Sequence, residues 1–331
     1  MSAPPFAGWV LVWRFGGFSE VEVVGLAAGR AVVRVAVGQV ALASGRADYP
    51  EVPLDAIAVD PAGYAAAAGS PALAAELRGG VVVSRGFATR RALHVGDSLP
   101  VGGGTVTVAG VVADALLGGY ELAIDVVGGR GLGLDRTTYV LVPGGGATST
   151  AALGSPPVRV RSPGERRYLR AADDVLPLGE VKARFGEFAV RRSGDDVTID
   201  PAWVSRNIVT RTVPLLGIVR CHRGIVDDLT GALAEIDRAG LGDRLDPADF
   251  RRSGGCFHPR PLRGGDGALS RHSWGIALDV NVAANPLGAA PSMDAGVVAA
   301  FARHGFTWGG NWLRPDGGHF EWVGEYGAAQ E

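Results

Sequence analysis

Residues 269–281 read L-S-R-H-S-W-G-I-A-L-D-V-N, and the interpretation of the whole chain starts from this stretch. It places His272 and Asp279 seven positions apart. Alternation along a strand would put Gly275, Ala277 and Asp279 on one face and the apolar residues between them on the other. The apolar face predicts core. The face with small residues leaves room for a metal and an extended substrate close to the backbone.

A second polar cluster lies in residues 308–322, W-G-G-N-W-L-R-P-D-G-G-H-F-E-W. It supplies His319, with Asp316 three positions before it and Glu321 two positions after it. The imidazole and carboxylate of the first stretch, together with this second imidazole, fill three corners of a zinc tetrahedron. The fourth corner stays open for water, which is how catalytic zinc is held.

The two stretches together resemble the zinc D-alanyl-D-alanine carboxypeptidases and L-alanyl-D-glutamate endopeptidases, the VanY-type peptidases. The shared pattern is S-x-H-x-x-G-x-A-x-D followed by D-x-x-H-F-E. It is matched here by Ser270, His272, Gly275, Ala277, Asp279, Asp316, His319 and Glu321. The resemblance implies that the two histidines and Asp279 hold Zn²⁺ and that Asp316 is the general base. Many members have Glu at that position, and Asp is one methylene shorter.

The resemblance also implies a basic residue that binds substrate or stabilises the transition state. Arg260, in G-G-C-F-H-P-R, matches the family's arginine, and Arg263 competes for the same role. A solvated surface charge is an equal alternative for either side chain. In the expected mechanism, zinc lowers the pKa of its bound water towards about 7. Asp316 takes the proton as the hydroxide attacks the amide carbonyl, then passes it to the leaving amine.

Three further side chains are candidates for supporting roles. Glu321 shares a strand face with His319 and is expected to accept a hydrogen bond from that imidazole. Ser270 is expected to orient His272 or to contact substrate. Trp274 either walls the cleft or packs in the core, since both environments suit an aromatic ring.

The composition indicates a globular α+β protein with two domains. The chain has 331 residues, 47% of them hydrophobic, with 51 glycines and 20 prolines. Its net charge of −2 offers no electrostatic footprint for nucleic acid. No apolar run has the length of a membrane-spanning helix. The N-terminus lacks the features of a signal peptide. The chain is therefore either cytosolic or a mature or excised ectodomain, and the peptidase resemblance favours the extracytoplasmic location.

The first half of the chain reads as β-rich. Strands are expected at residues 9–13, 21–24, 31–37, 81–83, 105–112 and 139–142. The segments V-S-R-G-F-A and V-G-D within residues 75–145 resemble the extracytoplasmic core domain of MacB-type ABC permeases. That resemblance implies a contact with another envelope protein.

A Gly-, Pro- and Ser-rich stretch, residues 143–165, predicts the boundary between a domain at 1–150 and a zinc peptidase domain at 160–331. The second domain is expected to contain a small antiparallel sheet flanked by helices at 223–239 and 294–304. Its two cysteines, Cys221 and Cys256, are either free buried thiols or a disulfide, and an envelope location favours the disulfide.

Three functional readings follow. The first is a zinc peptidase that cuts peptidoglycan stem peptides, as a D,D-carboxypeptidase or as an L-Ala-D-Glu endopeptidase. The second is a catalytically silent module that binds the cell wall or docks a partner; loss of a ligand or of the base would mark it, and none is lost. The third is a scaffold whose N-terminal domain has the main role.

Overall fold

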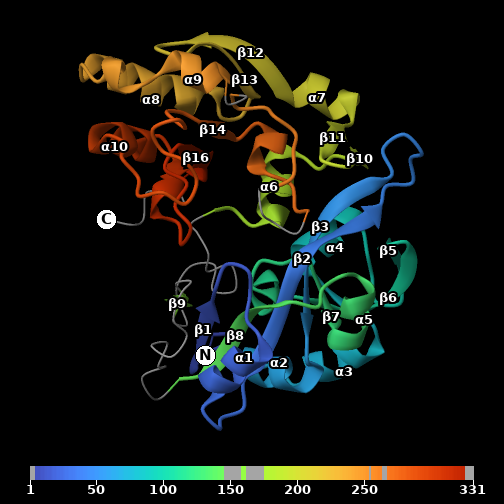
Figure 1. The fold of residues 1–331 in the computed structure, drawn as a ribbon. Helices are drawn as coiled ribbons and strands as arrows, with labels where there is room; N and C mark the ends of the chain where they lie inside the picture. Colours follow the sequence, from blue (N-terminus) through green and yellow to red (C-terminus); the bar gives the residue numbers. More distant parts are fainter. Residues whose placement is uncertain (1–3, 145–157, 162–174, 253–254, 263–266, 325–331) are drawn as a thin grey trace. The chain divides into compact units, whose positions relative to one another are not determined.

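The structure, a computed structural model, describes residues 4–144, 158–161, 175–252, 255–262 and 267–324 (Figure 1). The chain divides into two compact units. The first comprises Met1–Arg46, Glu51–Ala172 and Pro177–Val181, and the second comprises Ala47–Pro50, Asp173–Leu176 and Lys182–Glu331. Both units contain helices and strands, so the predicted α+β class is confirmed.

The core of the first unit is a closed ring of strand pairings. In order of pairing the strands are β3 (Glu51–Val59), β7 (Leu122–Asp125), β4 (Val81–Ser84), β6 (Gly104–Val112), β5 (Ser98–Val101) and β2 (Val33–Ala43), which pairs again with β3. The sheet continues from β2 through β8 (Thr137–Pro143), β1 (Trp9–Trp13) and β9 (Arg159–Arg161). Both faces of β3 and β4 are buried, because short helices contact strands whose other face lies inside the ring, so neither strand shows alternation in its sequence.

Short helices join these strands: α1 (Glu20–Ala27), α2 (Pro61–Ala68), α3 (Ala72–Gly79), α4 (Arg85–Arg91) and α5 (Val126–Gly131). The strand predicted at residues 21–24 is wrong, because these residues belong to α1. A capping box starts this helix. The Ser19 side chain accepts from the Glu22 backbone, and the Glu22 carboxylate accepts from the Ser19 N–H. These two bonds satisfy donors that a strand would have paired elsewhere.

The second unit follows α6 (Leu178–Phe185), inside which the division between the units falls. Its first half contains β10 (Val190–Ser193), β11 (Asp196–Ile199), α7 (Pro201–Asn207), β12 (Ile208–Val213), β13 (Gly217–His222), α8 (Val226–Arg238) and α9 (Pro247–Arg252). Its second half contains the 3₁₀-helix η5 (Arg271–Trp274), β14 (Ala277–Asp279), α10 (Ala295–Arg303), β15 (Phe306–Trp308), the 3₁₀-helix η6 (Gly309–Asn311) and β16 (His319–Trp322).

Two amphipathic helices form the scaffold behind the small sheet. The helix predicted at 223–239 is α8, which buries Leu229, Leu233 and Ile236 along one stripe. The helix predicted at 294–304 is α10, which packs against α8. A contact between Glu235 Oε2 and His304 Nε2, 3.1 Å apart, ties the end of α10 to α8. The sheet itself has the order β14-β16-β15, and both pairings are antiparallel, as predicted.

In the part of the chain that the structure describes, no helix combines the length and the apolar character needed to cross a membrane. β9 pairs with β1, which places residues 159–161 in the sheet of the first unit. Most of the predicted boundary, residues 143–165, lies outside the described residues. The domain boundary there stays a prediction.

We propose that the second unit folds without the first, because α8, α10 and the small sheet bury a core of their own. A protein that begins near Arg166 and ends at Glu331 should therefore unfold in one cooperative transition, followed by circular dichroism during heating. A protein of residues 1–165 serves as the matched half. Aggregation of the C-terminal protein, or a non-cooperative melt, would contradict the proposed division.

Candidate metal centre

The first predicted ligand, His272, lies on the 3₁₀-helix η5. Ser270 caps this helix, and its side chain accepts a hydrogen bond of 3.3 Å from the His272 backbone N–H. The helix ends at Gly275 in the left-handed conformation, with φ 68°. The predicted strand therefore starts too early: only residues from Ala277 onward pair as β14.

The requirement for glycine at position 275 comes from close packing inside the protein. A Cβ atom at this position would meet the His222 backbone nitrogen at 2.9 Å and the Ile208 Cδ1 at 3.0 Å. The glycine thus lets the end of η5 lie against β13, where the His222 N–H donates to the Gly275 carbonyl at 2.9 Å. The small size of Gly275 is therefore explained by this close backbone contact and not by space for a substrate.

The register of the small sheet brings the other two predicted ligands together. Asp279 on β14 is the direct partner of His319 on β16, and Ala277 is the partner of Glu321. Directly opposed residues in an antiparallel pair point to the same face. One backbone register therefore sets both the carboxylate–imidazole contact and the position of Glu321 beside it.

The Asp279 carboxylate lies between the two imidazoles. Its Oδ1 is 2.8 Å from His319 Nδ1, and its Oδ2 is 3.2 Å from His272 Nε2. All three residues are buried, with 8%, 5% and 1% of their surfaces exposed for Asp279, His319 and His272. A carboxylate this far from water needs positive partners on both oxygens.

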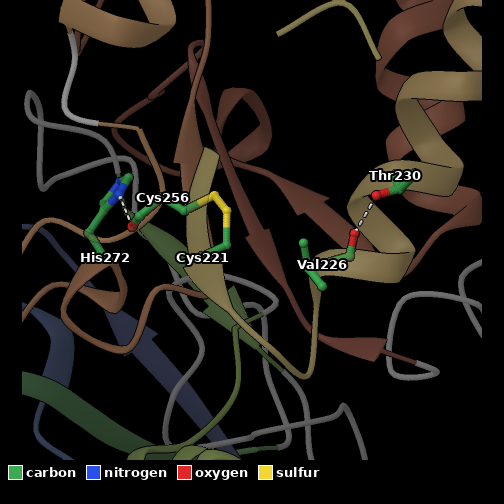
Figure 2. Close-up of a disulfide and its surroundings, with 5 residues drawn as sticks. All are labelled: Cys221, Val226, Thr230, Cys256 and His272. Atoms are coloured by element: carbon green, nitrogen blue, oxygen red, sulfur yellow. Dashed lines mark hydrogen bonds between the residues drawn. A yellow bond between two sulfur atoms is a disulfide. The ribbon is translucent and has the colours of Figure 1, made fainter. Parts of the chain in front are cut away.

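The His272 ring shows which atom is available for a metal. Its Nδ1 lies 3.1 Å from the backbone carbonyl of Cys256, as Figure 2 shows, and therefore carries the proton that it donates. Its Nε2 is therefore the atom left for a metal. That atom is buried, is 3.2 Å from Asp279 Oδ2, and has no well-formed hydrogen bond among the described residues. A metal ion bound by both atoms, or a proton held between them, would satisfy this buried pair.

Electrostatics in this cluster favour an ionised Asp279 and a protonated His319 when no metal is bound. Burial works to raise the pKa of Asp279, but the charges and hydrogen bonds of His272 and His319 outweigh it and hold the pKa well below its usual range. Burial works to lower the pKa of His319, but hydrogen bonds to Asp279 and Glu321 raise it to about 10.

The donor set fits zinc. One ligand atom from each of His272, Asp279 and His319 lies within 4.8 Å of the others. Two imidazole nitrogens and one carboxylate oxygen are the donors of hydrolytic zinc sites that keep one position open. Among the described residues, this trio is the group of His, Cys, Asp and Glu side chains arranged for a metal.

Asp316, the predicted base, lies in the loop between η6 and β16. Its backbone N–H donates to the Gly309 carbonyl at 2.9 Å, and its carbonyl accepts from the His319 N–H at 3.0 Å. Burial raises the pKa of its carboxyl group; the His319 charge opposes this shift and the Asp279 charge adds to it. A raised pKa suits a group that must take and return a proton near neutral pH.

Arg260 reaches the same cluster from the segment before η5. Its guanidinium Nη2 is 3.6 Å from Asp279 Oδ2. Its backbone is held in place because its carbonyl accepts from the Ser270 N–H at 3.0 Å and its N–H donates to the Ser273 hydroxyl at 3.3 Å. The competing candidate, Arg263, lies outside the described residues.

Glu321 lies beside His319 and is itself in contact with a residue that the sequence did not suggest. Its Oε2 is 3.8 Å from His319 Nε2, and its Oε1 is 3.3 Å from Arg271 Nε. Arg271 also donates to the Leu176 carbonyl at 2.8 Å. Arg271 and Glu321 are both buried. Arg271 directly precedes the predicted ligand His272. An arginine in a polar segment reads from sequence as a surface charge, and only the tertiary structure shows that it is buried.

The aromatic candidates divide between core and site. Trp274 is fully buried, packs against Phe188 with the rings tilted and their centroids 4.4 Å apart, and donates from Nε1 to the Gly186 carbonyl at 3.2 Å. It is therefore a core residue, which was one of the two alternatives that the sequence left open. Trp312 is the aromatic side chain beside the ligands, with its ring centroid 5.1 Å from that of His319.

The two cysteines form a disulfide, which resolves the alternative left open by the sequence (Figure 2). It joins Cys221 on β13 to Cys256, whose carbonyl holds His272. The next residue, Phe257, donates its N–H to the Arg220 carbonyl at 2.9 Å, so the segment lies along β13. The covalent bond thus anchors the carbonyl that sets the orientation of a predicted ligand.

Comparisons with known proteins agree with the peptidase resemblance. A family model described as D-alanyl-D-alanine carboxypeptidase matches residues 263–322, which contain all three predicted ligands and Asp316. Among solved structures, the extracellular domain of the noncanonic ABC-type transporter YknZ from Gram-positive bacteria is similar. It shares 17% identity, covers 44% of this chain and 88% of its own, and has a TM-score of 0.32. No curated protein matches the chain.

Zinc content tests the ligand set. The full chain should bind roughly one zinc, and His272→Ala or His319→Ala should lose most of it, because a three-ligand site rarely holds its ion with two. His304→Ala is the matched control, since that imidazole contacts Glu235 instead. Metal analysis after dialysis gives the result, and full zinc retention in both ligand variants would rule out this site.

The pH dependence of zinc binding follows from His319. Its pKa of about 10 in the metal-free protein means that zinc must displace a proton at pH 7 to 9. We expect about one proton released per zinc and an affinity that rises about tenfold per pH unit below pH 10. Calorimetry in buffers of different ionisation enthalpy measures the proton. Binding that is independent of pH would show that His319 is neutral before the metal arrives.

Removal of the disulfide should affect both stability and metal affinity. The Cys256→Ser variant should lose roughly 3–4 kcal/mol of unfolding free energy on the chain-entropy estimate. Its zinc affinity should fall by about 10-fold or more because the carbonyl that orients His272 is less fixed. Chemical denaturation and competition with a chelator measure the two effects.

The control for that experiment is Thr230→Val. This change removes a hydrogen bond from Thr230 Oγ1 to the Val226 carbonyl on α8, a bond of 2.7 Å that lies away from His272 (Figure 2). It should lower stability without changing zinc affinity. Equal zinc affinities in the wild type and in Cys256→Ser would show that the disulfide does not position the ligand.

Proposed function

We propose that the second unit is a zinc-dependent peptidase that hydrolyses peptidoglycan stem peptides, as a D,D-carboxypeptidase or as an L-Ala-D-Glu endopeptidase. The observation that carries this proposal is the buried cluster of His272, Asp279 and His319, in which His272 Nε2 faces Asp279 Oδ2 at 3.2 Å and one ligand atom of each residue lies within 4.8 Å of the others. The family match over residues 263–322 supports the peptidase class. The presence of a candidate base and a candidate cation beside the ligands favours catalysis over a silent binding module.

Zinc held by His272, Asp279 and His319 would act as a Lewis acid that activates water and polarises the amide carbonyl. The chain's own groups would manage protons and charge around it. Asp316 would accept a proton from the attacking water and deliver it to the leaving amine. The raised pKa of its carboxyl group makes the protonated form accessible for the second transfer.

Arg260 would stabilise the negative charge that develops on the carbonyl oxygen. Its guanidinium lies 3.6 Å from Asp279 Oδ2, so it is already at the ligand cluster and needs no large movement to act. Its side chain is 18% exposed, which leaves one side open to a substrate. Ser270 and Ser273 fix its backbone, and both belong to the segment that carries His272.

We propose an extracytoplasmic location for this activity. The Cys221–Cys256 disulfide supports it, because such bonds form and persist in oxidising compartments. Peptidoglycan peptides, the proposed substrates, are also extracytoplasmic. A contact between the first unit and another envelope protein stays a prediction from the sequence resemblance of residues 75–145.

Asp316→Asn tests the role of the base. The amide keeps the size of the side chain but cannot accept a proton, so turnover should fall by about 10²–10⁴-fold while zinc content is unchanged. Asp195→Asn, an exposed carboxylate in the same unit, should behave as the wild type. Mass spectrometry of defined muropeptides after incubation measures cleavage. Near-normal cleavage by Asp316→Asn would assign the base elsewhere, with Glu321 as the first alternative.

A further inference from the structure

The loop between η6 and β16 carries the candidate base, and its backbone is bonded to the turn that precedes it. The Gly309 carbonyl accepts two hydrogen bonds, from the Trp312 N–H at 3.0 Å and from the Asp316 N–H at 2.9 Å. Further along, the His319 N–H donates to the Asp316 carbonyl at 3.0 Å. Backbone bonds therefore join the candidate base to the first residue of η6 and to a predicted metal ligand.

The Asp316 side chain has no such anchor. Among the residues that the structure describes, none forms a hydrogen bond or an ion pair with its carboxylate. Burial raises the pKa of this carboxyl group, and the charges of the three predicted ligands and of Arg260 also act on that pKa, so the group lies among them. Its position relative to these residues therefore depends on how firmly the loop backbone is held.

An indole N–H holds the loop on the other side of the base. Trp308, the last residue of β15, donates from Nε1 to the Gly317 carbonyl at 2.9 Å. Gly317 directly follows Asp316 in the chain. β15 and β16 share three residue pairs, so the donor belongs to the sheet that carries His319. The bond therefore fixes the base relative to the strand of a predicted ligand.

Two glycines show how closely the indole and the loop fit. A Cβ atom at Gly309 would meet the Asp316 carbonyl oxygen at 2.7 Å. A Cβ atom at Gly310 would meet three atoms of the Trp308 ring at 2.2, 2.3 and 2.5 Å. Neither glycine has a positive φ, so these contacts, and not the backbone conformation, explain why both positions lack a side chain.

We propose that Trp308 is a positioning residue, whose indole N–H holds the Asp316 carboxylate beside the predicted ligands through its bond to the Gly317 carbonyl. The indole itself touches neither substrate nor metal in this role. The inference rests on the proposed function for the identity of Asp316 as the base. The bond and the fit of the ring come from the structure alone.

The test uses the full chain with Trp308→Phe, which keeps an aromatic ring and removes the indole N–H. Trp322→Phe is the matched control, because it removes another indole N–H from the same sheet, where Trp322 Nε1 donates to Asp228 Oδ2 at 2.7 Å. Cleavage of a synthetic stem pentapeptide gives kcat and KM, and metal analysis gives the zinc content. Hydrogen exchange followed by mass spectrometry reports on the loop through the hydrogen-bonded amides of Trp312 and Asp316.

Trp308→Phe should lower kcat by about 10- to 100-fold, because a small displacement of a catalytic group causes a loss of that size. KM should stay within about twofold and the zinc content should not change, since no ligand and no substrate contact is altered. The amides of Trp312 and Asp316 should exchange about tenfold faster, because the loop has lost one hydrogen bond. Trp322→Phe should keep the kcat and the loop exchange of the wild type.

Two further variants separate positioning from a general loss of structure. Gly310→Ala keeps the indole N–H but displaces the Trp308 ring, so it should lower kcat in the same way even where Trp308→Phe does not fold. In the Asp316→Asn background, Trp308→Phe should have little further effect on residual cleavage, because both changes act through one carboxylate. Additive losses from these two changes, or a wild-type kcat in Trp308→Phe, would overturn the proposal.

The anchoring bond and the peptidase activity can fail separately. Faster loop exchange in Trp308→Phe, with no cleavage by the wild type, would support the anchor and reject the proposed peptidase. Cleavage with the same kcat in the wild type, Trp308→Phe and Gly310→Ala would support the peptidase and reject the positioning role of Trp308.

Discussion

The Asp279 carboxylate is the constraint on which the rest of the second unit depends. It is buried and keeps its negative charge only because an imidazole lies at each oxygen. Each imidazole is in turn held from outside, His272 by the Cys256 carbonyl and His319 by Glu321. The surrounding structure can be understood as the set of contacts that keep these three groups in place without water.

Burial also explains why the charged groups occur as a chain rather than as isolated pairs. Burying the Glu321 carboxylate without a positive partner would destabilise the fold. The Arg271 guanidinium, 3.3 Å away, offsets this desolvation cost. Arg260 does the same for the second oxygen of Asp279. Removal of any one member would leave its neighbour charged and unpaired in a poorly hydrated site. The cluster is therefore expected to respond to substitution as a unit and not residue by residue.

The sequence predicted which residues lie together at the candidate site better than it predicted their local geometry. Residue types and spacing were enough to select the ligand trio, since few folds would place two histidines and an aspartate with these flanks by chance. Spacing could not reveal that Gly275 ends a 3₁₀-helix, because that depends on the approach of β13. The burial of Arg271 and the core position of Trp274 could not be read from the sequence for the same reason, because tertiary packing sets both. In the first unit, the strand predicted at 21–24 failed because a local signal, Ser19 with Glu22, outweighed the apolar run.

The contact between Asp279 and His319 joins residues that are 40 positions apart in the chain. Closing a loop of that length has an entropic cost that grows with the logarithm of its length, and β14 and β16 share only three residue pairs to offset it. A metal bound by both side chains would favour the closed loop directly. The ion that serves hydrolysis would then also act as a cross-link of the sheet, so that the last strand of the domain would be held in register by the same bond that prepares the site for reaction.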